Sequence, residues 1–100
     1  MLTKEQITKK LRDNYQFLAA EFGLKKIGLF GSYATGTQRE ESDIDIIADF
    51  KKPIGLHFIE FVEYLEVLFG KKTDVITVAG LKGIRSKNIA RSIKRTTEYV

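Results

Sequence analysis

The sequence predicts a mixed α/β domain in which helices pack on a small mixed sheet of three or four strands. Apolar residues recur at helical spacing in long segments near the N-terminus and in the middle of the chain. Short runs rich in β-branched residues lie between these segments, which favours strands. The chain has 100 residues, of which 43% are hydrophobic. This length and composition indicate a single domain with a modest core.

The first predicted element is a helix over residues 4–22. Thr3 and Gln6 have the spacing of a capping box, in which each side chain bonds the backbone of the other residue. Apolar side chains follow at helical spacing, at Ile7, Leu11, Tyr15, Leu18 and Phe22. Gly23 is a typical residue to end this helix.

A strand over 26–30 follows, and it leads into the Gly31-Ser32 turn. Ser32 can open a short helix over 32–35. The polar loop 36–42 then leads into a second strand over 43–50. The apolar residues Ile44, Ile46 and Ala48 alternate along this strand and should face a layer of helices.

The second half of the chain predicts a helix over 56–69, a strand over 73–78 and a last helix over 86–97. Gly70 is a typical C-terminal stop for the first of these helices. The segment 79–83 reads as a short connection. The last helix is weakly apolar and is marked by Ile84, Ile89 and Ile93, with Tyr99 as a further candidate.

Two acidic residues interrupt the strand over 43–50. Asp43 and Asp45 are two residues apart, so on an extended strand their side chains point to the same face. Their repulsion favours a bound cation, and Mg²⁺ commonly takes carboxylate oxygens together with substrate phosphates. The Gly31-Ser32 turn can supply backbone groups to those phosphates. The alternative is an exposed polar face of an edge strand, which strand propensities disfavour.

These residues resemble those of a known family. The segments GSYATG, SDIDII and TDVIT occur in this order, with ten residues between Gly31-Ser32 and Asp43. They are similar to the motifs of the minimal nucleotidyltransferases, which belong to the DNA polymerase beta superfamily. The resemblance covers residues 25–83 and implies that fold, with its polymerase beta-like palm.

The resemblance also implies a set of site residues. Asp43, Asp45 and Asp74 would be the catalytic acids and the ligands of two Mg²⁺ ions, with Asp74 as the third acid on a later strand. The alternative is that Asp74 is a turn residue. Gly31 and Ser32 would bind the phosphates of ATP or another nucleoside triphosphate.

The family pattern commonly has arginine at the position of Thr35, which puts the affinity for the substrate in question. Arg39, on the neighbouring loop, is a candidate substitute for that cation. The alternative is an ordinary solvated arginine.

The resemblance further implies transfer of a nucleoside monophosphate, with AMP expected, to a hydroxyl of a partner protein, with release of pyrophosphate. Members of this family are often paired with a helical HEPN-domain protein, and some pairs act as toxin and antitoxin. The alternative is an inactive module that only binds the HEPN partner. Transfer to a small molecule such as an aminoglycoside would need an acceptor domain that a chain of this size has little room for.

Composition restricts the other classes of function. The chain has no cysteine and one histidine, which excludes a disulfide scaffold and a cysteine zinc site. No apolar run is long enough to span a membrane and no signal core is visible, so we expect a cytoplasmic protein. The net charge of +4 comes from the last twenty residues, where six basic residues face one acid. That segment is either a solvated helix face or a surface for nucleic acid. A homodimer is left open.

Overall fold

The computed structural model describes residues 2–100 and confirms the predicted fold class. The elements in order are α1 (Lys4–Phe22), β1 (Leu24–Phe30), α2 (Ser32–Thr35), β2 (Ile44–Phe50), α3 (His57–Phe69), β3 (Thr73–Thr77), α4 (Val78–Lys82), α5 (Lys87–Thr96) and β4 (Glu98–Tyr99). The four strands form one mixed sheet in the order β3-β2-β1-β4. β1 runs antiparallel to both β2 and β4, and β2 runs parallel to β3.

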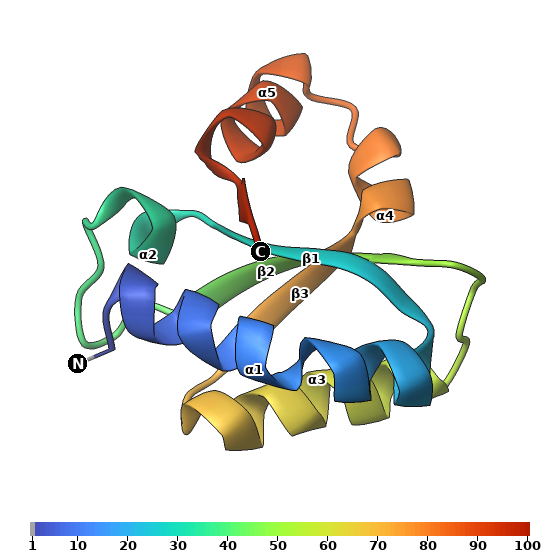
Figure 1. Cartoon of the computed structure of the whole chain (residues 1–100). Helices are drawn as coiled ribbons and strands as arrows, with labels where there is room; N and C mark the ends of the chain where they lie inside the picture. Colours follow the sequence, from blue (N-terminus) through green and yellow to red (C-terminus); the bar gives the residue numbers. More distant parts are fainter. Residues whose placement is uncertain (1) are drawn as a thin grey trace.

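The sheet lies between two unequal layers of helices. α1 and α3 cover one face, and α4 and α5 stand on the other (Figure 1). The core lies under α1 and α3, where Ile44, Ile46 and Ala48 of β2 are fully buried as the alternating pattern predicts. They join buried side chains from both helices, including Ile7, Leu11, Leu18, Phe61 and Leu65. Because this layer buries most of the apolar surface, it supplies most of the stability of the fold.

The ends of α1 form as the sequence predicts. The Thr3 backbone N–H donates to Gln6 Oε1 at 2.9 Å, and the Gln6 backbone N–H donates to Thr3 Oγ1 at 3.2 Å. At the other end Gly23 has φ 70° and its N–H donates to the Ala19 carbonyl. Glycine adopts this left-handed conformation without the strain that a side chain would cause.

The structure corrects several predicted bounds, among them the start of β2 at Ile44, which leaves Asp43 just before the strand and not on it. β1 begins at Leu24, two residues earlier than predicted, because the fully buried Leu24 already pairs with Phe50. A short helix, α4, replaces the predicted connection, and the Thr77 hydroxyl caps it by accepting from the Gly80 N–H at 2.9 Å. Tyr99 does not continue the last helix but lies in β4, where it pairs with Gly28.

The connection through α3 makes β2 and β3 parallel neighbours, which sets the register of the two strands. Ile44 pairs with Thr73, Asp45 with Asp74 and Ile46 with Val75. Two acids that are far apart in sequence therefore face each other across neighbouring strands. Within residues 2–100, none of the helices has the length and hydropathy that a membrane crossing requires.

Candidate functional site

Gly31 lies at the end of β1 and makes a close approach to the acidic strand. Its φ of 74° and ψ of −153° fall in a region that is essentially restricted to glycine. A Cβ at this position would collide with Asp45 Oδ2 and would lie 3.1 Å from Asp45 Cγ. On its other side, the Gly31 N–H donates to Thr96 Oγ1 at 3.5 Å. The turn therefore joins the acidic strand to the end of α5.

The three acids gather at the start of β2 and β3. Asp45 is the direct register partner of Asp74, and it also pairs with Phe30, the last residue of β1. Asp43 lies just before the first residue of β2. The pKa of the Asp45 carboxyl is raised to about 6. Burial is the largest cause, followed by the charges of Asp74 and Asp43. Asp74 and Asp43 are thus close enough to Asp45 for their charges to disfavour its ionisation.

A divalent cation fits the chemistry of these acids, although their side chains do not converge on one point. Within residues 2–100, no three Asp, Glu, His or Cys side chains are grouped closely enough to hold an ion. Asp43 Oδ2 lies 3.9 Å from Lys72 Nζ, so this carboxylate is engaged by a lysine. Three acids that repel one another are the donor set that a hard cation relieves.

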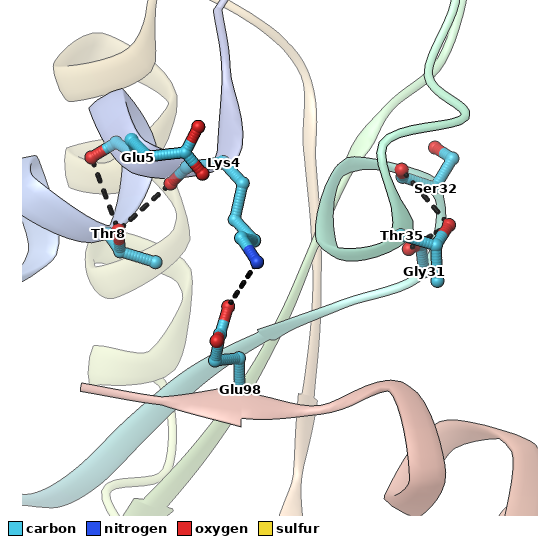
Figure 2. Close-up of polar contacts among 7 residues, drawn as sticks. All are labelled: Lys4, Glu5, Thr8, Gly31, Ser32, Thr35 and Glu98. Atoms are coloured by element: carbon cyan, nitrogen blue, oxygen red, sulfur yellow. Dashed lines mark hydrogen bonds and ion pairs between the residues drawn. The ribbon is translucent and has the colours of Figure 1, made fainter.

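The short helix α2 follows Gly31 and carries Ser32, the second residue of the predicted phosphate-binding turn. Tyr33 is buried and fixes α2 against the domain. The Thr35 hydroxyl lies within 3.3 Å of the carbonyl oxygens of Gly31 and Ser32, to which it donates (Figure 2). Thr35 therefore directs its polar group into its own helix. Ser32 lies at the start of this helix, directly after Gly31.

Arg39 lies on the loop between α2 and β2. Its backbone N–H donates to Ser42 Oγ at 3.0 Å, which stabilises the local turn. Its side chain is exposed. Arg39 is close to the Gly31-Ser32 turn in the sequence. Among the described residues, however, the structure shows no hydrogen bond or ion pair between its guanidinium and that turn.

The sequence pattern missed a cavity beside α2. Residues from α1, α2 and the junction of α5 with β4 surround a space of about 410 Å³ that includes Thr35 and Arg95. No local signal could have found it, since its walls come from three segments that only the fold brings together. The Lys4 side chain forms an ion pair at 3.2 Å with Glu98 on its wall (Figure 2).

Comparison with known proteins identifies a matching family model and similar proteins. A family model described as a nucleotidyltransferase domain matches residues 5–100. The chain is 42% identical over 101 residues to the protein adenylyltransferase MntA of Thermococcus cleftensis, and the match covers 100% of this chain and 98% of that protein.

Two solved structures have similar folds. One, provisionally assigned as a minimal nucleotidyltransferase, has a TM-score of 0.73 at 24% identity and covers 97% of this chain and 95% of that chain. The other is a crystal structure of a toxin–antitoxin with AMP-PNP. It has a TM-score of 0.64 at 27% identity and covers 98% of this chain and 72% of that chain.

Proposed function

Because the chain belongs to the nucleotidyltransferase domain family, we propose that it transfers AMP from ATP to a hydroxyl group on a partner protein. The observation that carries this proposal is the register pair of Asp45 and Asp74 beside Gly31. An enzyme that moves a nucleotide needs acids that hold cations and a backbone turn that phosphates can approach closely. The relatives that the chain resembles over its full length support the choice of AMP.

Each residue of the site has a role in this reaction. Asp43, Asp45 and Asp74 would hold Mg²⁺, which neutralises phosphate charge and makes the acceptor hydroxyl more acidic. Gly31 and Ser32 would position the triphosphate so that the acceptor oxygen lies in line with the bond to be broken. The acceptor oxygen bonds to the α-phosphorus and the bond from that phosphorus to the β-phosphate oxygen breaks. Pyrophosphate leaves, and the hydroxyl proton passes to Asp74 or to water.

The acceptor should come from a second protein. With 100 residues the domain offers the cavity and the acids, but little further surface for an acceptor. A related structure is a toxin–antitoxin, and the family resemblance points to a HEPN-domain protein as the partner. In this proposal the chain is the antitoxin that adds AMP to a HEPN toxin.

Intact-mass spectrometry tests the proposal. The purified chain, Mg-ATP and a candidate HEPN partner should yield partner molecules heavier by one or more AMP groups. The Asp43→Asn, Asp45→Asn double variant is the control, because it keeps the side-chain volumes and removes both charges. An unmodified partner with the wild-type chain, or equal modification with the double variant, would contradict the proposal.

One observation favours an alternative, a module that binds the partner without catalysis. Thr35 stands where the family commonly has arginine, and its hydroxyl is turned toward its own helix. For such a module, the double asparagine variant would control the toxin as well as the wild-type chain does. For an enzyme, the variant would still form the complex but would lose that control.

A further inference from the structure

The cavity beside α2 is lined by polar and charged groups from three segments. α1 contributes Lys4 and α2 contributes Thr35. The end of α5 and the start of β4 contribute the remaining polar residues, which are Arg95, Thr96, Thr97 and Glu98. The space of about 410 Å³ is a shallow depression that is largely open to solvent, so a ligand can reach it without a change of the fold.

Arg95 supplies the uncompensated charge of this cavity. Lys4 and Glu98 neutralise each other through their ion pair at 3.2 Å (Figure 2). Among residues 2–100, no carboxylate lies within ion-pair distance of Arg95, and its side chain is exposed at the end of α5. A planar guanidinium with five N–H donors suits the oxygens of a phosphate. The cavity therefore has the charge and the donor geometry for an anion.

The same cavity adjoins the Gly31 turn. The Gly31 N–H donates to Thr96 Oγ1, and Thr96 and Thr35 both line the cavity. Because Gly31 also lies against Asp45, the turn connects the acidic strand to the cavity. A triphosphate that extends from the acids past this turn would bring its terminal phosphates toward the cavity.

Arg95 also lies where the family pattern has lost a cation. Thr35 occupies the position that commonly carries arginine, and it lines the same cavity as Arg95. A guanidinium that reaches this cavity from α5 could therefore replace one that would reach it from α2. Arg39, by contrast, is not among the residues that line this space.

We propose that this cavity binds the terminal phosphates of the nucleotide and that Arg95 is the cation that holds them. The proposal deepens the nucleotidyltransferase function and rests on it for the identity of the ligand. Arg95 would act through the terminal phosphates, which leave as pyrophosphate. It would therefore contribute to ATP binding and would also offset the negative charge that develops on the departing group.

Calorimetry with inorganic tripolyphosphate and Mg²⁺ tests the site without catalysis. Removing a charge-assisted hydrogen bond, Arg95→Ala should weaken binding roughly tenfold or more. Arg95→Lys keeps the charge but not the fork of donors, so it should lie between the alanine variant and the wild type. Lys94→Ala is the matched control. It removes one positive charge from the neighbouring position of α5, outside the cavity, and should change binding less than twofold.

A second variant tests the relation to Thr35. Thr35→Arg in the Arg95→Ala background should restore most of the lost affinity, since it returns a guanidinium to the same cavity. Equal binding by the wild type and Arg95→Ala, or an equal loss with Lys94→Ala, would overturn the proposal. A circular dichroism spectrum that matches the wild type shows that each variant is folded.

Kinetics separate this inference from the proposed function. If the chain transfers AMP, Arg95→Ala should raise KM for ATP and lower kcat/KM. Transfer with an unchanged kcat/KM would defeat the phosphate site alone. Tripolyphosphate binding that depends on Arg95, without transfer to any partner, would defeat the transferase proposal and leave the phosphate site in place.

Discussion

The Asp45 carboxylate lies against the backbone of Gly31 so closely that no side chain fits between them. Position 31 therefore requires glycine for two reasons: its backbone has a positive φ, and a side chain would collide with Asp45. This contact links the strand that carries the acids to the turn expected to approach the phosphates.

Gly31→Ala should reduce both stability and activity. The methyl group would force Asp45 or the turn to move, and the backbone would be strained at its positive φ. We expect a loss of at least about 2 kcal/mol in the free energy of unfolding and near-complete loss of AMP transfer. Urea unfolding and the transfer assay measure the two effects.

Gly36→Ala provides the comparison for Gly31. Gly36 has a similar φ of 78°, but a Cβ there meets no atom within 4 Å. This variant should lose about 1–2 kcal/mol through backbone strain alone and should keep its activity. If Gly31→Ala were as active as Gly36→Ala, the close approach of Gly31 to Asp45 would have no role in the site.

Asp45→Asn should stabilise the metal-free domain at neutral pH. The pKa of Asp45 is about 6 in the folded chain against an ordinary value of 3.8. Folding therefore favours the protonated acid, and the stability that this contributes is lost as the pH rises through 6. Because the carboxyl is half exposed, we expect a discounted gain of about 1 kcal/mol above pH 7.

The pH dependence provides the check on this prediction. Below about pH 3 the carboxyl is protonated in both states, so wild type and Asp45→Asn should unfold at the same urea concentration. The measurement is urea unfolding in a chelating buffer at the two pH values. A variant that is less stable than the wild type at neutral pH would show that Asp45 is not held among repelling charges.

Lys72→Ala should increase the affinity of the site for Mg²⁺. The lysine lies 3.9 Å from Asp43 and competes with a cation for that carboxylate. Since this pair is largely exposed, the expected change is small, roughly a twofold lower Mg²⁺ concentration at half-maximal activity. A titration of activity against Mg²⁺ measures it. A weaker response to Mg²⁺ in the variant would mean that Lys72 supports the site rather than competing in it.

Phe61→Ala tests the core that carries the site. Phe61 is fully buried and contacts the rings of Phe22 and Phe50 with centroid distances of 5.2 and 5.0 Å. Its removal should cost about 3–5 kcal/mol. Thermal unfolding measures this loss. Well below the new midpoint, the activity per folded molecule should equal that of the wild type, since no atom of Phe61 reaches the acids.

The sequence predicted those parts of the fold that depend on local patterns. The capping box of Thr3 and Gln6 and the alternation of Ile44, Ile46 and Ala48 each follow from neighbouring residues, and the structure confirms them. The pairing of Asp45 with Asp74 follows from the parallel crossover that a strand, a helix and a further strand commonly form.

The parts that escaped prediction depend on contacts between distant segments. β4 has only two residues and no periodicity, and it exists because the chain end pairs with Gly28 and Leu29. The cavity that includes Arg95 has the same origin, since its walls come from three separate segments, at Lys4, at residues 34–35 and at residues 95–98. α4 begins with a cap at Thr77, which is also the last residue of β3. Because the residues there continue the strand pattern, no separate signal in the sequence marks the start of this helix.

The most direct test of the central claim follows the α-phosphate of ATP. The chain, Mg²⁺ and its partner protein are incubated with ATP radiolabelled at either the α- or the γ-phosphate. If Asp43, Asp45 and Asp74 form a nucleotidyltransferase site, the partner gains only the α-label, and Asp45→Asn or Asp74→Asn abolishes the transfer. Transfer of the γ-label, or α-label transfer that survives both substitutions, would contradict the account.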